Sequence, residues 1–91
     1  MVESLDRNAS LPVFGVPGTV EAVRAEALFV SALQPSASPR PDQVRHAVAT
    51  TLRRLGAHAC AVRMAGEFGD HPDTAAARMS WALATIHAAM R

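Results

Sequence analysis

Proline and glycine divide this chain into four stretches, each long enough for one helix. The breaks fall at Pro17-Gly18, in the proline-rich linker from Gln34 to Asp42, at Gly56, and between Gly69 and Pro72. Proline suits the first turn of a helix because it lacks a backbone donor, and glycine favours the position just after a helix. Between the breaks, apolar residues recur every three or four positions, which is the period of an amphipathic helix. The pattern predicts an all-α fold.

The spacing of apolar residues also gives approximate bounds. We expect four helices, over Thr19 to about Leu33, Pro41 to Leu55, about Ala57 to Phe68, and about Pro72 to Met90. Together, residues 19–91 are expected to form a single small four-helix domain. Residues 1–18 precede the first predicted helix and are expected to form an N-terminal arm. The last two helices are predicted to be a helix-turn-helix-like pair.

The core of such a domain must be built from small side chains. Among the 91 residues, 49% are hydrophobic but only 4% are aromatic, so Ala, Val, Leu and Met fill most of the interior. A chain of this size supports one modest core. The first helix has apolar residues on two sides, so it needs two neighbours to pack against. We expect a homodimer on this ground, with Phe29 and Leu33 among the contacts, unless the N-terminal arm covers that side.

Charge and cysteine content limit the class of protein. The formal net charge is +1 and all nine basic residues are arginine, a balance that neither demands nor excludes binding to nucleic acid. Cys60 is the one cysteine, so no intramolecular disulfide can form. The first ten residues carry Glu3 and Asp6, and the apolar stretch after them is short and broken by Pro and Gly. We therefore expect a cytoplasmic protein without a signal peptide or membrane span.

The sequence contains no recognisable motif for catalysis. His58, Cys60 and His71 have metal-ligand chemistry, but their spacing matches no tetrahedral zinc site. Cys60 lies on an apolar stripe, where a thiol serves packing rather than nucleophilic attack. A glycine-rich phosphate loop is also missing. We expect a protein that is not an enzyme and that needs neither a metal nor another cofactor.

One stretch does carry a resemblance. In "RMAGEFGDHPDTAAARMSWAL", residues 63–83, a small residue is followed by a glycine and then by spaced apolar positions, as a helix-turn-helix requires. The stretch resembles the C-terminal DNA-binding domain of extracytoplasmic-function sigma factors at five positions: Ala65, Gly69, Thr74, Arg78 and Ala82. The whole chain is also similar to small uncharacterised proteins of high-GC bacteria, a likeness that implies no activity.

The sigma-factor resemblance implies a small transcription-associated regulator that binds DNA weakly. In that case Ala65 should lie at a close helix crossing and Gly69 should have a positive φ. The outward positions of the last helix are mostly Ala, Ser and Asp, which read base edges poorly. Affinity for DNA would then depend on phosphate contacts from five arginines: Arg45, Arg53, Arg54, Arg63 and Arg78.

An alternative function uses the same helical fold. The chain is equally consistent with a non-catalytic protein–protein interaction module, in which Phe29, Leu33 and Trp81 contact a transcription-related or other protein partner. Aromatic side chains commonly anchor such contacts. The sequence leaves both alternatives open, and the alanine-rich last helix favours the interaction module.

Overall fold

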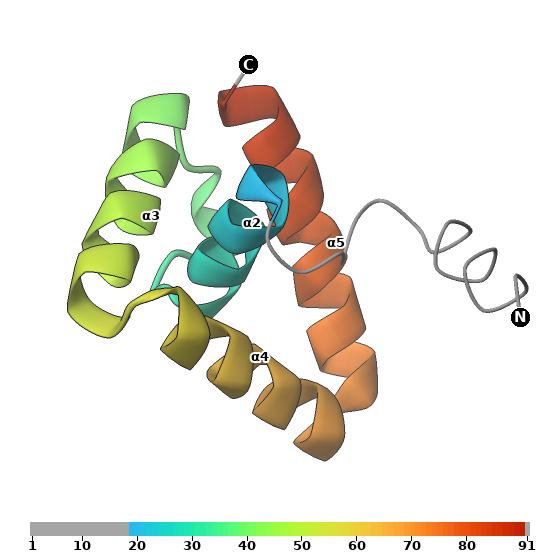
Figure 1. Ribbon diagram of the computed structural model, residues 1–91. Coiled ribbons are helices and arrows are strands. Elements are labelled where there is room, and N and C mark those ends of the chain that lie inside the picture. Colours follow the sequence, from blue (N-terminus) through green and yellow to red (C-terminus); the bar gives the residue numbers. More distant parts are fainter. Residues whose placement is uncertain (1–18, 91) are drawn as a thin grey trace, which may run out of the picture.

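Helices make up nearly all of the part of the chain that the structure describes. The structure is a computed structural model and describes residues 19–90; within them the elements are α2 (Val20–Val30), the 3-10 turn η1 (Pro35–Ala37), α3 (Pro41–Leu55), α4 (Ala57–Asp70) and α5 (Pro72–Ala89) (Figure 1). The predicted all-α fold is confirmed there. The arm expected over residues 1–18, and Arg91, lie outside the described residues.

Helix α2 is the centre of the fold. It packs against α3, α4 and α5, which surround it in Figure 1. Five of its residues are buried: Ala22, Ala25, Ala27, Leu28 and Phe29. Alanine predominates because three helices approach α2 closely, and small side chains leave room for that approach. Apart from the exposed Val20 at its start, α2 therefore packs its apolar sides against the chain itself, and the reason that we gave for a homodimer is wrong.

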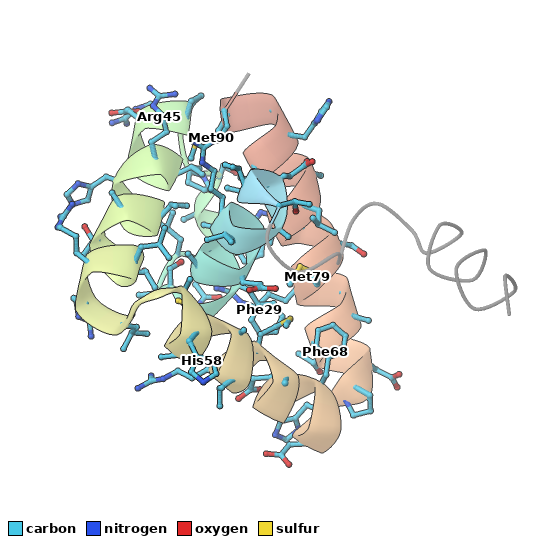
Figure 2. The ribbon with its side chains drawn as sticks, viewed as in Figure 1. Phe29, Arg45, His58, Phe68, Met79 and Met90 are labelled. Carbon is cyan, nitrogen blue, oxygen red and sulfur yellow. The ribbon has the colours of Figure 1, made fainter. Side chains whose placement is uncertain are left out.

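Burial also corrects one predicted contact residue. Phe29 is only 5% exposed, and its ring stacks on that of Phe68 with centroids 6.0 Å apart (Figure 2). The side chain belongs to the core, where α2, α4 and α5 meet. Phe29 is thus not on a surface that a partner could reach, contrary to its assignment from the sequence.

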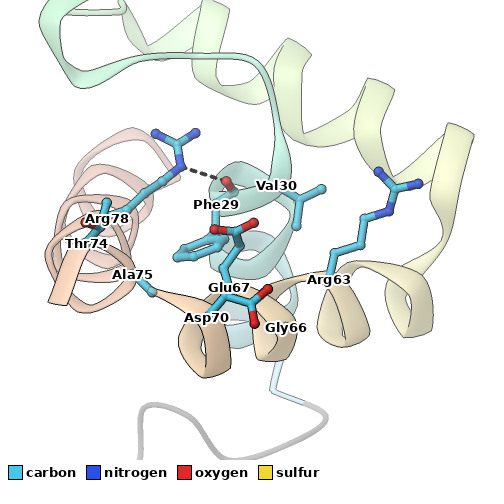
Figure 3. Close-up of a pocket in the computed structure, with 9 residues that line it drawn as sticks. All are labelled: Phe29, Val30, Arg63, Gly66, Glu67, Asp70, Thr74, Ala75 and Arg78. Atoms are coloured by element: carbon cyan, nitrogen blue, oxygen red, sulfur yellow. Dashed lines mark hydrogen bonds between the residues drawn. The ribbon is translucent and has the colours of Figure 1, made fainter. Parts of the chain in front are cut away.

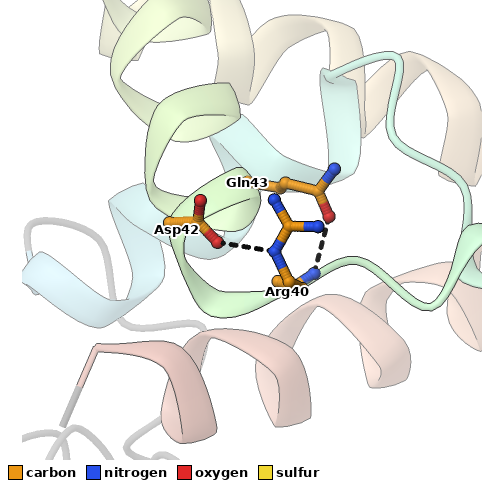
Figure 4. A network of polar contacts seen from close by, with 3 residues as sticks. All are labelled: Arg40, Asp42 and Gln43. Atoms are coloured by element: carbon orange, nitrogen blue, oxygen red, sulfur yellow. Dashed lines mark hydrogen bonds and ion pairs between the residues drawn. The ribbon is translucent and has the colours of Figure 1, made fainter.

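Local hydrogen bonds fix where the helices begin. Thr19 Oγ1 accepts a hydrogen bond from the Ala22 N–H at 3.0 Å and thereby caps the start of α2. At the start of α3, the Gln43 side chain accepts from the Arg40 N–H at 2.8 Å, and Arg40 Nε donates to Asp42 at 3.2 Å (Figure 4). This hydrogen bond holds the pKa of the Asp42 carboxyl below its ordinary value. Pro41 occupies the first turn, as predicted.

The connections between the last three helices are very short. Gly56 alone separates α3 from α4, with φ at +84°, a conformation that side chains with a Cβ rarely adopt. His71 alone separates α4 from α5. A DNA-binding helix-turn-helix uses a turn of about three to four residues. The α4–α5 connection is therefore tighter than the motif that the sequence suggested.

Two expectations tied to that motif are wrong. Ala65 is exposed and is not buried at a helix crossing. Gly69 lies inside α4 and has no positive φ; among the described glycines, Gly56 has one. The inner line of α4 consists of Cys60, Met64 and Phe68 instead, which all pack into or against the core. The α4–α5 pair is a helical corner that lacks the close crossing expected at Ala65.

Candidate interaction surface

Arg78 is built into the fold. From α5 it reaches the carboxyl end of α2, where its Nε donates to the Phe29 carbonyl at 2.7 Å (Figure 3). Its Nη2 donates to the carbonyls of Ser31 at 3.1 Å and Leu33 at 2.8 Å. The last carbonyls of a helix have no partner within the helix, and a planar guanidinium can satisfy several at once. Arg78 therefore caps α2 from a distant part of the chain.

This arrangement involves three predicted site residues, Arg78, Trp81 and Leu33. The Arg78 guanidinium also lies over the Trp81 ring, 5.0 Å from its centroid, so that the aromatic side chain covers one side of the partly buried cation. Burial lowers the pKa of Arg78 from its ordinary value, but a guanidinium stays charged at neutral pH. Arg78, predicted to contact DNA phosphates, is instead engaged with backbone carbonyls. Leu33, predicted as a partner contact, is half-buried and supplies one of these carbonyls.

The other predicted DNA contacts are divided in space. Arg45 is exposed, but its Nη1 donates to the Ala89 carbonyl at 3.0 Å, near the end of α5 (Figure 2). Arg53 and Arg54 lie exposed in the last turn of α3, and Arg63 is exposed on α4. These last three remain available to a ligand.

The residues considered for catalysis or metal binding are not brought together. Cys60 is fully buried, and this burial, aided by the nearby Glu26 carboxylate, raises the pKa of its thiol above the ordinary value. A neutral buried thiol is a poor nucleophile. In the part of the chain that the structure describes, no group of three or more His, Cys, Asp or Glu side chains could hold a metal ion.

The side of α4 that points away from the core is exposed and carries no formal charge. We call it the outer face of α4, and it consists of six residues: His58, Ala61, Val62, Ala65, Gly66 and Gly69. All are exposed except the half-buried Ala61, and Val62, at 56%, is one of two large apolar side chains that the described residues leave exposed. These positions recur at three- and four-residue spacings, so they lie on one side of the helix.

Within residues 19–90, nothing in the structure requires two residues of this face to be glycine. A Cβ placed on Gly66 or Gly69 would meet no atom of these residues within 4 Å, and neither glycine has a positive φ. Glycine inside a helix costs about 0.5 to 1 kcal/mol relative to alanine because the unfolded chain loses more conformational freedom. The monomer thus carries this cost with no packing or backbone geometry that requires it. Gly66, inside a helical pattern, was the signal in the sequence that could have pointed to this face.

We accordingly expect Gly66→Ala to stabilise the monomer. The free energy of unfolding should rise by about 0.5 to 1 kcal/mol, because alanine is the better helix former and its methyl group meets only open space. Urea unfolding followed by circular dichroism measures the change. As a matched control, Gly56→Ala should lower stability, since Gly56 has a positive φ. A loss of stability in Gly66→Ala would contradict the description of this face.

Charged side chains border the outer face on one side. Arg63, Glu67 and Asp70 are exposed and, together with Gly66 at the edge of the outer face, line a groove between α4, the end of α2 and the start of α5 (Figure 3). They follow one another at spacings of four and three residues, with the positive charge nearer the amino end of α4. The face therefore has an uncharged centre and a polar border, an arrangement typical of protein–protein interfaces.

Comparisons with known proteins add no assignment: no protein-family model, no curated protein and no solved structure matches this chain. Within residues 19–90, none of the helices has the length and apolar character needed to cross a membrane.

Proposed function

We propose that this protein is a non-catalytic helical interaction module and that it meets its partner through the outer face of α4. The observation that carries the proposal is the pair of glycines at positions 66 and 69, which face open space inside a regular helix. Residues without a side chain are useful where another backbone approaches closely. The exposed Val62 beside them supplies apolar area that contact with a partner would remove from water.

A helix is the partner element that this surface fits. Small residues at three- and four-residue spacings leave little side-chain bulk on this side of α4, so the side-chain ridge of another helix can pack closely there. Formal charge is missing from the centre of the face and present at its border, in Arg63, Glu67 and Asp70. Such a border supports orientation and association rate more than affinity.

Site-specific crosslinking in the cells that produce the protein tests this proposal. A photo-reactive amino acid at position 62 should give a discrete protein adduct, and the same amino acid at position 88, exposed on α5, should not. The adduct at position 62 should disappear when Gly66 is replaced by leucine, which adds side-chain bulk to this side of α4. Adducts at both positions in equal yield, or at neither, would refute the assignment of the surface.

DNA binding is the alternative that the sigma-factor resemblance implies. The observation that favours it is the exposure of three arginines, Arg53 and Arg54 in the last turn of α3 and Arg63 on α4. Against it, Arg78 of the proposed recognition helix is held by α2 carbonyls, and the acidic Glu67 and Asp70 lie close to Arg63. We therefore rank DNA binding second.

A further inference from the structure

We infer that the partner of the outer face of α4 is a second copy of this chain, with the two α4 helices packed antiparallel. The inference rests on the proposed function, because it names the occupant of the same face. Two independent features favour a second copy: the shape of the face is self-complementary, and the charges along its border change sign from one end to the other.

Val62 and Gly66 make the shape of the outer face self-complementary. These residues are one helical turn apart, so both lie on the outer face, one as a protruding side chain and the other as a gap. When two α4 helices run antiparallel about Met64, Val62 of each copy is opposite Gly66 of the other. The same contact then forms twice, as the symmetry of a two-fold dimer requires. A parallel pair would place Val62 against Val62 and leave both gaps empty.

The charges along the border of the face favour the same antiparallel arrangement. Arg63 lies toward the amino end of α4, and Glu67 and Asp70 lie toward its carboxyl end, all exposed and on one side of the helix. In the antiparallel pair, the same side of each helix meets, so Arg63 of one copy comes next to Glu67 of the other, again twice. Antiparallel helix dipoles are also favourable, because each positive end lies beside a negative end.

The size of the contact sets the expected strength. A single pair of helices of 14 residues each buries less area than the roughly 1,200 Å² of the smallest stable protein complexes. We therefore expect a weak and reversible dimer, with a dissociation constant on the order of 10 to 100 μM. The exposed ion pairs should make the association weaker at high salt.

Sedimentation of the purified full-length protein measures this association. Between about 10 μM and 1 mM protein, the average mass should rise from that of one 9.6 kDa chain toward twice that value. The variants Gly66→Leu and Val62→Asp should remain monomeric, whereas the matched control Ala88→Leu on the exposed side of α5 should behave as the wild type. Wild-type protein that stays monomeric over the whole range, or an Ala88→Leu variant that also loses the dimer, would overturn the inference.

A conservative variant tests whether loss of the dimer in Gly66→Leu comes from the lost contact or from misfolding. Gly66→Ala should be more stable than the wild type and yet dimerise more weakly, by about threefold to tenfold, because its methyl group meets Val62 of the second copy. A folded Gly66→Ala variant that dimerises as the wild type does would count against the proposed register.

A charge exchange tests the antiparallel direction. Arg63→Glu alone should weaken dimerisation by about threefold to tenfold, because the new glutamate faces Glu67 of the second copy. The double variant Arg63→Glu, Glu67→Arg should regain wild-type affinity, since opposite charges again face each other. If the double variant is no better than the single one, the antiparallel pairing is wrong.

The crosslinking result separates this inference from the proposed function. An adduct at position 62 with the mass of two chains supports both. An adduct with another protein, from a chain that sediments as a monomer, refutes the second copy and supports the interaction module. The lack of any adduct at position 62 refutes both.

Discussion

Replacing Arg78 by alanine is expected to lower the free energy of unfolding by about 2 to 4 kcal/mol. The guanidinium donates hydrogen bonds to the carbonyls of Phe29, Ser31 and Leu33. Without it, these carbonyls lose a charged donor at the end of the central helix, and the Trp81 ring loses the cation that it covers. Thermal unfolding should show the loss as a fall in Tm of about 10 to 20 °C.

The control for this prediction is Arg54→Ala. Arg54 is exposed, so its removal should change stability by no more than about 0.5 kcal/mol. Arg78→Lys should recover little of the lost stability, because one ammonium group cannot reach several separated carbonyls in the way that a planar guanidinium does. Equal stability of the Arg78→Ala and Arg54→Ala variants would show that Arg78 does not cap α2 in solution.

Leu28→Ala is expected to be similarly costly, at about 3 to 4 kcal/mol. Leu28 is fully buried and lies in the middle of the hydrophobic core, where α3, α4 and α5 surround α2. Truncation removes apolar contacts and leaves a cavity that three packed helices cannot easily close. Urea unfolding gives the value directly.

Val20→Ala is the matched control on the same helix. Val20 is 62% exposed, so its truncation should cost no more than about 0.5 kcal/mol. If the two variants lost the same stability, the central position of α2 would be wrong.

The sequence predicted the helices best where a proline or glycine marks an end. Pro41 begins α3, Gly56 follows it with a positive φ, and Pro72 begins α5, as expected. The end of α2 was predicted at Leu33 but lies at Val30. The difference has a physical reason: Ser31 Oγ donates to the Leu28 carbonyl at 2.7 Å, and Arg78, far along the chain, binds the carbonyls around this end. The Arg78 contact cannot be read from the local sequence.

The side of each helix that faces the core was harder to predict than the position of the helix in the sequence. Helix α4 contains so many small apolar residues that several of its sides looked suitable for the core, and Ala65 was placed on the buried side, whereas the inner line is Cys60, Met64 and Phe68. In the first predicted helix, the sequence drew attention to Phe29 and Leu33 but not to Leu28, which the structure buries fully. The spacing of apolar residues identifies the buried face of a helix only where polar residues occupy the opposite face.

The candidate surface depended on what the sequence could not show. Arg78 looked like a phosphate contact because arginine commonly is one, and only the fold reveals that α2 occupies its donors. Phe29 was predicted to contact a partner, but its ring packs against Phe68, a contact that the sequence does not show because the two residues are far apart along the chain. The glycines of α4 are evident in the sequence, but only the structure shows that none of the described residues packs on Gly66 or Gly69.

The central claim is that this protein acts through the uncharged outer face of α4 and not through phosphate contacts. The most direct measurement is the binding of the wild-type protein to a fluorescent random duplex DNA at several salt concentrations. The account predicts no affinity that changes steeply with salt, and no difference between the wild type and the combined Arg53→Ala, Arg54→Ala, Arg63→Ala variant. Binding whose log affinity falls with log salt with a slope of about −3, and becomes flatter by about one unit for each arginine removed, would contradict the account.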